Sequence, residues 1–455
     1  MCDWIVWVHN YGAVERLEQE KKECAKGSYL SFIYVDFTDA IIDATIDLLR
    51  HSAKQERLWK ELEFQCCSGP MHDIIQEATK LDMFSSIIVS MAGYEMMRDD
   101  NAMHFLLTCS ALSSAIKYNS RLLMINLDCV NDMSRKQFAA LCDGLQTAGE
   151  TFEELILKRI AFTDHEVALQ LNSSLRTLHV IGCDLRDSQI VQLVESLGLH
   201  PSIRELSIGH NCCDSQGLEA LGRLLTNSKL QALSLNHQRE GLASKVQILR
   251  GGLRENKFLE RLYLSGNNLK DADLVQLAQS LSTCQRLEKL DLSNNKISGG
   301  GLEIFASHIP KSLKRLCLHS NSFGEEDGWC HLLRILQDNP QLLQVDCHSD
   351  SELDPLDSNR SKTQQDIEHF RDFNRSGRLL LCNINYAAPL SLWPVVLARA
   401  NNLFEQDFRA CRRGANVIYH LLQGPALMQR KVNMAGNEKR PPRIQPYRHS
   451  KRVET

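Results

Sequence analysis

Two pairs of histidines recur at matching places in a repeated nine-residue pattern. His210 and His237 are the eighth residues of IRELSIGHN (203–211) and LQALSLNHQ (230–238). His319 and His348 are the seventh residues of LKRLCLHSN (313–321) and LLQVDCHSD (342–350). If these patterns form neighbouring strands, each pair lies side by side, an arrangement that can hold zinc or respond to pH. Two ligands make a poor metal site, and no carboxylate occupies the matching position of a neighbouring repeat. We therefore expect polar, exposed histidines with no metal and no cofactor.

The sequence lacks the motifs of the common catalytic classes. It contains no Gly-rich phosphate loop, no H-E-x-x-H and no G-x-S-x-G. The glycines at 299–301 are not followed by Lys and Ser/Thr, so they predict a turn into a helix. Cys66 and Cys129 have no base at a recognisable spacing. We therefore predict that the protein is not an enzyme.

The pattern that carries the histidines repeats five times between Ile203 and Asn321. Its copies begin at 203, 230, 259, 287 and 313, which are 27, 29, 28 and 26 residues apart. Each fits L-x-x-L-x-L-x-x-N/C, the leucine-rich repeat. In LERLYLSGN (259–267), Leu262 and Leu264 point to one side of a short strand, whereas Tyr263 faces the other side. We expect the final asparagine to turn inward and bond backbone groups that would otherwise be unpaired.

A helical pattern follows each strand pattern. Leu274, Leu277 and Leu281 recur at helical spacing after Asn267, and similar triplets follow Asn211 and Cys183. Helices need about 8–10 Å of lateral room, whereas parallel strands need only about 4.8 Å. A stack of such units must bend. We predict a right-handed α/β solenoid, a horseshoe with a parallel inner sheet and outer helices.

Fainter copies extend the solenoid on both sides. LRTLHVIGC (175–183), FEELILKRI (152–160), LLMINLDCV (122–130) and WKELEFQCC (59–67) fit the template, and LLQVDCHSD (342–350) is a plausible last strand. FSSIIVSMA (84–92) and LSFIYVDFT (30–38) fit marginally. These copies predict about twelve units across 30–350, after a lead-in at 1–29. Weaker matches at the ends are expected, because the terminal units of a solenoid must present one face to water.

Residues 30–350 resemble the ribonuclease-inhibitor type of leucine-rich repeat, whose units run to about 28 residues and accept Asn or Cys at the ninth position. The resemblance is specific for the fold and unspecific for function. It implies a protein-binding inner wall, made by the outward-facing strand residues. The candidate partner-binding residues are Lys158, Arg159, His179, Ser207, His210, Asn236, His237, Tyr263, Asp291, Asn294, His319, Asp346 and His348.

Two functions remain open at this point. The first is a non-catalytic interaction scaffold that binds a protein partner on the inner wall, with Tyr263 as the best anchor. The alternative is a GTPase-activating regulator, similar to leucine-rich-repeat activators of small GTPases that use a loop arginine. Arg186 and Arg239 follow strand patterns in DLRDSQ and NHQREG, where solvent-exposed arginine is also common without such a role.

The repeat pattern ends near Asp350. Residues 351–366 are polar and predict a linker, and 367–428 predict a mainly helical cap, with a helix entered through Pro389 and another ending at Gly424. Whether the cap also docks a partner stays open. The tail at 429–455 carries eight Lys or Arg against two Glu, and we expect it to be disordered. It could serve as a nuclear-import signal or simply be solvated.

Composition and charge fit an intracellular protein without a membrane anchor. The formal charge of −4 over 455 residues argues against a nucleic-acid or membrane-surface binder. No run of about 18 apolar residues exists, and WIVWV (4–8) is too short for a signal peptide. The sixteen cysteines are scattered without C-x-x-C, so we expect reduced thiols and a cytoplasmic, possibly nuclear, location.

Overall fold

The structure is a computed structural model of the whole chain. It describes residues 4–347 apart from 24–26, 91–98, 133, 163–170, 172, 199 and 324–325, together with Ile367, Phe370, Arg371, Asn374 and Arg375. The chain divides into two compact units, Met1–Leu379 and Leu380–Thr455, and every described residue belongs to the first. The predicted linker, nearly all of the predicted cap, and the basic tail lie outside the described residues.

Strands and helices alternate along the first unit. The strands are β1 (Trp4–His9), β2 (Gly27–Ile33), β3 (Glu61–Gln65), β4 (Ser86–Ser90), β5 (Met124–Asp132), β6 (Glu154–Ala161), β7 (Thr177–Ile181), β8 (Glu205–Ser207), β9 (Ala232–Ser234), β10 (Arg261–Tyr263), β11 (Lys289–Asp291), β12 (Arg315–Cys317) and β13 (Gln344–Asp346). The helices are α1 (Ala13–Glu23), α2 (Asp39–Lys54), α3 (Met71–Lys80), α4 (Asp99–Tyr118), α5 (Arg135–Gln146), α6 (Asp187–Leu197), α7 (Ser215–Asn227), the 3₁₀ turn η1 (Val246–Leu249), α8 (Arg250–Glu255), α9 (Asp271–Leu281), α10 (Gly299–Ala306) and α11 (Glu326–Asp338).

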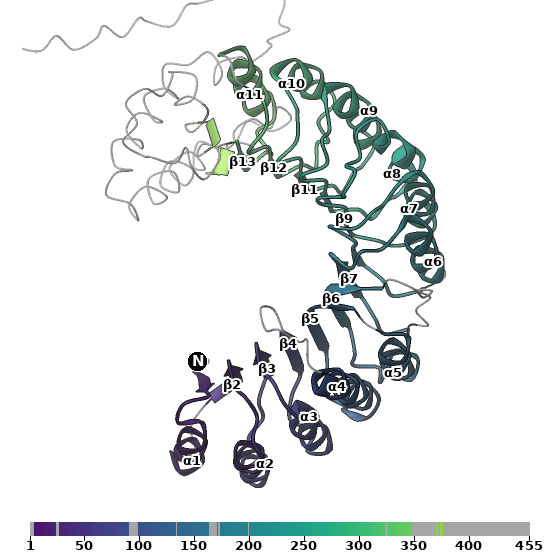
Figure 1. Cartoon of the computed structure of the whole chain (residues 1–455). Helices are drawn as coiled ribbons and strands as arrows, with labels where there is room; N and C mark the ends of the chain where they lie inside the picture. The colour runs from purple at the N-terminus through teal and green to yellow at the C-terminus, as the bar shows by residue number, and fades with distance from the viewer. Residues whose placement is uncertain are drawn as a thin grey trace, which may run out of the picture. The chain divides into compact units, whose positions relative to one another are not determined.

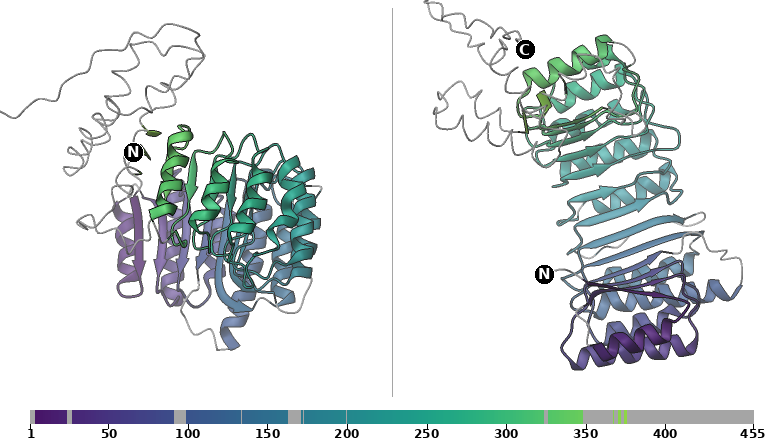
Figure 2. Two further views of the ribbon diagram at one scale, coloured as in Figure 1. Left: turned by 90° about the horizontal axis from the view of Figure 1, so that it is seen from above. Right: turned by 90° about the vertical axis from the view of Figure 1, so that its left-hand side faces the viewer.

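All thirteen strands form one parallel sheet in chain order, from β1 to β13. Within the first unit the strands line the inner side of a curve and the helices cover its outer side (Figure 1). Side views show the strands running next to one another with the helices in a separate layer (Figure 2). The predicted solenoid with a parallel inner sheet and outer helices is confirmed.

The repeated leucines form a single row through the core. Leu206 pairs with Leu233, Leu233 with Leu262, Leu262 with Leu290, and Leu290 with Leu316. Each of these side chains is 0% exposed. The helical leucines predicted to cover them, such as Leu274, Leu277 and Leu281 on α9, are buried as well. The apolar side of each unit is thus covered by its neighbours, as expected for a stacked repeat.

The sheet begins earlier than the sequence patterns indicate. β1 lies within the segment interpreted as a lead-in, and it pairs in parallel with β2. The marginal unit at 30–38 is out of register by three residues, because Leu30 and Phe32 pair with Leu62 and Phe64 as the ladder positions. The template had placed Ile33 there instead. Apolar residues occur on both faces of these strands, so periodicity alone could not choose the register.

The asparagine at the ninth position links successive repeats. The backbone N–H groups of Cys183 and Leu185 donate to Asn211 Oδ1, at 3.0 and 3.1 Å. Asn211 Nδ2 donates to the carbonyl oxygens of Val180 and Ile208. The same arrangement recurs at Asn267, Asn295 and Asn321, and at Gln238 in the unit that lacks asparagine. The predicted inward turn of these amides is confirmed.

The eighth residue of the repeat has a left-handed backbone in repeat after repeat, whether or not an amide follows it. Nine eighth-position residues have φ between +51° and +69°: Tyr34, Cys66, Arg159, Gly182, His210, His237, Gly266, Asn294 and Ser320. A positive φ at this point turns the chain sharply out of the strand, so that the ninth residue enters the core. Non-glycine residues adopt this conformation at a cost. In the C-terminal repeats the hydrogen bonds of the buried ninth-position amide offset that cost. The eighth side chain is therefore held at the edge of the inner wall.

Ile367 and Asn374 extend the core beyond the last strand. Ile367 is 1% exposed and belongs to the core cluster, and Asn374 is fully buried. Asn374 Nδ2 donates to the carbonyl oxygens of Leu336, Asn339 and Leu342, at 3.0–3.3 Å. These contacts cover backbone groups at the end of the last repeat, whose helix is α11.

Candidate functional site

The inner wall, as used here, consists of the third, fifth, seventh and eighth residues of each repeat pattern. On a strand the third, fifth and seventh residues alternate with the buried fourth and sixth, so they face away from the core. The eighth residue follows the strand, and its positive φ holds it at the edge of the wall. Strand pairing puts the fifth residues side by side: His179 beside Ser207, Ser207 beside Ser234, Ser234 beside Tyr263, and Tyr263 beside Asp291. The row continues through Cys317 and Asp346.

The candidate residues named from the sequence occupy three of these four places. His179, Ser207, Tyr263, Asp291 and Asp346 take the fifth position, Lys158, Asn236 and His319 the seventh, and Arg159, His210, His237 and Asn294 the eighth. His348 lies outside the described residues. Ser207 differs from the others because it is only 6% exposed. It lies between His179 and Ser234 and offers little surface to a partner.

Tyr263 and Lys289 form a contact pair near the middle of the C-terminal repeats. Lys289 Nζ lies 4.7 Å from the centroid of the Tyr263 ring, within cation–π distance. Both side chains are partly exposed. Asp291, beside Tyr263, accepts from the backbone N–H of Ser293 at 3.0 Å. A partly exposed ring held by a neighbouring cation is the kind of rigid, amphipathic group that anchors protein interfaces.

His210 and His237 stack at the edge of the wall. Their ring centroids lie 4.7 Å apart with an interplanar angle of 15°. A Cβ on Gly266, in the next repeat, would lie 2.0 Å from His237 Nδ1, so only glycine leaves room for this ring. Burial, and then the charge of His237, lower the pKa of His210. The side-by-side placement predicted from the sequence is confirmed for this pair.

A chain of charges crosses the wall beside the histidines. His179 Nε2 lies 3.2 Å from Glu205 Oε1, and Arg261 Nη2 donates to Glu205 Oε2 at 2.8 Å. Arg261 stands on β10 and Glu205 on β8, so the arginine reaches over Ala232 on β9. The hydrogen bond from His179, together with the charge of Arg261, lowers the pKa of Glu205. Lys158 is partly exposed, and Arg159 pairs with Asp128 at 2.7 Å.

The third position of the repeat also belongs to the inner wall, although none of the candidate residues predicted from the sequence occupies it. The third residue of a repeat faces the same side of the sheet as the fifth, which comes two places later in the chain. The third residues include Glu205, Arg261, Lys289 and Arg315. The alternation of strand side chains would have predicted this. The predicted candidates lie between or just after the two ladder leucines, whereas the third residue precedes both. Ile5 and Trp7 on β1 were missed for another reason, since β1 was not assigned to the sheet; both are 45% exposed.

The loops between strands and helices hold the two arginines of the GTPase hypothesis. Arg239 Nη2 lies 2.6 Å from Asp184 Oδ1, although its side chain is 62% exposed. Arg186 is exposed and precedes α6. Neither position tests the hypothesis, so a GTPase-regulating role stays a prediction.

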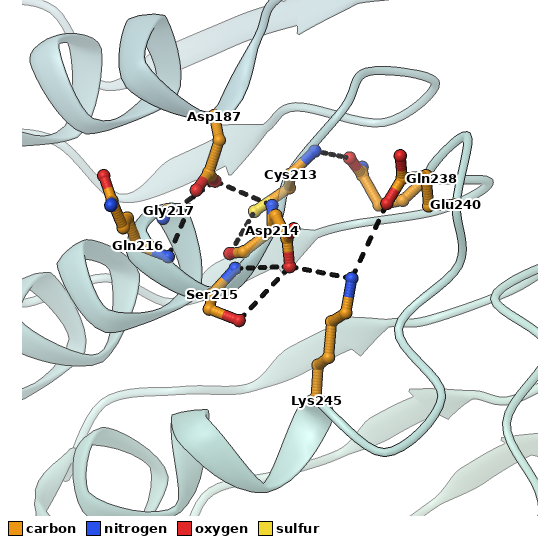
Figure 3. A network of polar contacts seen from close by, with 9 residues as sticks. All are labelled: Asp187, Cys213, Asp214, Ser215, Gln216, Gly217, Gln238, Glu240 and Lys245. Carbon is orange, nitrogen blue, oxygen red and sulfur yellow. Dashed lines mark hydrogen bonds and ion pairs between the residues drawn. The ribbon is translucent and has the colours of Figure 1, made fainter.

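Polar contacts fix these loops across successive repeats (Figure 3). The carboxylate of Asp187 accepts from the backbone N–H groups of Asp214, Gln216 and Gly217, which open α7. Lys245, from the following repeat, lies 2.7 Å from Asp214. The hydrogen bond from Lys245 lowers the pKa of Asp214. This cluster caps a helix and joins three repeats, a structural role that accounts for its charged groups.

The described residues offer neither a metal-ligand cluster nor a membrane-spanning helix. In that part of the chain, no three His, Cys, Asp or Glu side chains are grouped so that they could hold a metal ion. The described helices also include none with the length and apolar character needed to cross a membrane.

The comparisons with known proteins agree with this fold. A family model described as leucine-rich repeats (2 copies) matches residues 257–299. The ribonuclease inhibitor of Sus scrofa is 31% identical over 169 residues, covering 36% of this chain and 37% of that protein. The NACHT, LRR and PYD domains-containing protein 9 of Bos taurus is 26% identical over 250 residues, covering 52% of this chain and 24% of that protein. An internalin structure from Listeria monocytogenes has a TM-score of 0.39 at 14% identity, covering 74% of this chain and 85% of that one.

The repeats and the sheet define a leucine-rich-repeat solenoid, and the relatives that the chain resembles include ribonuclease inhibitors. The chain spans less than two thirds of the length of the curated relatives it matches.

Proposed function

We propose that the protein is a non-catalytic interaction scaffold that binds a protein partner on its inner wall. The observation that carries the proposal is the Tyr263–Lys289 pair, a partly exposed ring and cation on a continuous parallel sheet. Partly buried aromatic groups ringed by polar side chains supply most of the energy of typical interfaces. Around this pair the wall offers Asp291, Asn236 and the stacked histidines, which can form adaptable hydrogen bonds.

The backbone at the wall is rigid enough to present such a surface. Each strand is bonded on both sides from β2 to β12, and the buried amide ladder fixes the turn after each strand in the C-terminal repeats. The backbone that carries the wall residues is therefore ordered before a partner binds, which lowers the entropic cost of association.

The proposal includes a cytoplasmic or nuclear location. It is supported by buried, reduced thiols of the described repeats, which donate hydrogen bonds to backbone carbonyl oxygens. Cys183 Sγ lies 3.5 Å from the carbonyl oxygen of Leu157, and Cys67 Sγ lies 3.4 Å from that of Phe32. Burial raises the pKa of each thiol to about 12, so both are protonated donors. A disulfide would remove these bonds. Imaging of the tagged full-length protein in its own cells tests the location.

The binding proposal is tested by exchanging Tyr263 for alanine. Full-length protein is used to capture partners from its own cells, and the affinity of each partner is then measured by calorimetry. We expect Tyr263→Ala to weaken the partner about 10- to 30-fold, the usual loss for a central aromatic group.

Tyr118→Ala is the matched control. Tyr118 is also exposed and also has a lysine over its ring, Lys117 at 5.3 Å, but it ends the outer helix α4. A partner that is weakened equally by both variants, or by neither, would refute binding on the inner wall.

A further inference from the structure

Three cations lie side by side at the third position of successive strands. Strand pairing puts Arg261 opposite Lys289, and Lys289 opposite Arg315. We call Arg261, Lys289 and Arg315 the cation row. Adjacent strands are about 4.8 Å apart, and like charges directly opposite each other destabilise a sheet. The row therefore carries an electrostatic cost that a bound anion would relieve.

The positive charges of the cation row are neutralised by other groups of the protein to a decreasing extent from Arg261 to Arg315. Arg261 is bonded to Glu205 at 2.8 Å. Lys289 has the ring of Tyr263 in place of a carboxylate. Arg315 is exposed, and no described carboxylate lies within ion-pair distance of it. The unneutralised charge thus grows from β10 towards β12.

Three carboxylates flank the cation row, and two are engaged elsewhere. Glu288 pairs with Lys314 on the neighbouring strand. Asp291 accepts from the hydroxyl and the backbone N–H of Ser293. Glu260 is the third and is partly exposed. With Lys314 counted, four cations stand near Glu260, Glu288 and Asp291, and Glu205 pairs with Arg261. The region therefore has no broad positive field, and its attraction for an anion is local to Lys289 and Arg315.

The same position has the opposite sign earlier in the sheet. Glu61, Glu154 and Glu205 occupy the third place on β3, β6 and β8. Ala232 on β9 separates these acids from the cation row. The wall thus selects the orientation of a charged partner as well as its charge.

We infer that the inner wall over β10–β12 binds an acidic, extended segment of a protein partner. Carboxylates two residues apart in an extended chain are separated by about 6.6–6.8 Å, between one and two strand spacings, so one can reach Lys289 while the next reaches Arg315. An apolar residue two places before the first carboxylate faces the wall as well and can pack on Tyr263, which stands on β10. Arg315 supplies the bidentate donor that suits a carboxylate. This inference rests on the proposed function and names the chemistry of the partner.

The experiment uses full-length protein and a fluorescein-labelled peptide of about twelve residues, with glutamates at alternate positions and leucine or glycine between them. A peptide with glutamine in place of glutamate is the neutral control. We expect the acidic peptide to bind at least about 10-fold more tightly than the neutral one, measured by anisotropy, and to weaken as salt screens the charges. Equal binding of the two peptides would overturn the inference.

Variants locate the binding. Arg315→Glu and Lys289→Glu should each weaken the acidic peptide about 10-fold or more, and Arg315→Gln should weaken it less, because it removes the charge without reversing it. Arg250→Glu is the matched control, since Arg250 is exposed at the start of the outer helix α8; we expect a change below about 2-fold. Thermal unfolding confirms that each variant is folded.

Two other outcomes would refute the inference. Acidic-peptide binding that survives Arg315→Glu would place the binding elsewhere, for example on the basic residues at 429–455. A single-stranded RNA of about twelve nucleotides that binds more tightly, and is lost with the same variants, would assign the cation row to nucleic acid. A cellular partner that is lost with Tyr263→Ala but kept with Arg315→Glu would leave the scaffold proposal standing and remove only its acidic partner.

Discussion

At the scale of single residues, the ninth-position amide joins the backbones of neighbouring repeats through hydrogen bonds. Its oxygen accepts from the backbone of one repeat and its nitrogen donates to another, so one side chain satisfies groups that no secondary structure pairs. Gln238 and the thiol of Cys183 fulfil part of that role with different chemistry. The position requires a buried polar group of suitable reach rather than asparagine itself.

Replacing Asn267 by alanine should be severely destabilising. Asn267 is fully buried, accepts from the backbone N–H of Gln238 at 3.1 Å, and donates to the carbonyl of Leu235 at 2.8 Å. Leaving these groups unpaired should lower the free energy of unfolding by about 2–3 kcal/mol. Urea denaturation measures this. Asn227→Ala, at the exposed end of α7, is the control and should be nearly neutral.

The stacked histidines give a residue-scale prediction about pH. In the folded protein, burial and the charge of His237 lower the pKa of His210 below its ordinary value of 6.5. The unfolded chain therefore binds a proton first as the pH falls, and stability decreases below that value. Because His210 is exposed, we expect a loss of only about a few tenths of a kcal/mol.

His237→Ala should raise the pKa of His210, because it removes both the ring and its charge. Imidazole resonances followed by NMR between about pH 5 and about pH 8 report this directly. His319→Ala, on the same wall but four repeats beyond His210, should leave that pKa unchanged. An unchanged His210 titration in His237→Ala would show that the stack does not control its protonation.

At the scale of elements, the outer helices α7 and α8 pack closely where a glycine permits it. The repeat after β9 has the short helices η1 and α8 in place of one long helix. A Cβ on Gly252 would lie 2.3 Å from the carbonyl oxygen of Gly222 on α7. Gly251, its neighbour, has nothing within 4 Å of the corresponding point. The two glycines thus differ in packing although they are adjacent in one helix.

Alanine at these two positions should act in opposite directions. Gly252→Ala should lower the free energy of unfolding by about 1–3 kcal/mol, because α7 and α8 would be forced apart. Gly251→Ala should raise it by about 0.5–1 kcal/mol, because alanine favours a helix and meets no obstacle. Thermal and urea unfolding of the pair test this. Destabilisation of similar size in both would argue against close packing of α7 on α8.

At the scale of the whole molecule, each repeat contacts mainly its two neighbours, so stability is local. The described structure closes the C-terminal repeat with Ile367 and Asn374, which lie beyond the last strand. Buried groups of this kind protect α11 and β13 from water. Their loss is expected to loosen the end of the solenoid without unfolding its centre.

Asn374→Ala should expose that end. The carbonyls of Leu336, Asn339 and Leu342 would lose their donor. We expect hydrogen exchange to accelerate about 10-fold or more in α11 and β13, and to stay unchanged in β3–β8. Arg334→Ala, an exposed change on α11, serves as the control. Uniform acceleration along the chain would contradict a local, repeat-by-repeat stability.

The sequence by itself determined the repeat, the core row and the inward amides. Leucines two apart and renewed at a near-constant period admit only one arrangement that buries them, so Leu206 and Leu316 could be placed in one row without coordinates. The side-by-side placement of His210 and His237 followed from the same period.

Only the tertiary structure decided the first strand, its register and the neighbours of each wall residue. β1 and β2 are apolar on both faces, so their pattern fits more than one register until β3 fixes it. Arg261 reaches Glu205 across β9 because the residue between them is the small Ala232. Lys289 lies over the ring of Tyr263 on the adjacent strand. Such contacts join residues about 26–56 positions apart, and they depend on side-chain conformations that a repeat period does not contain.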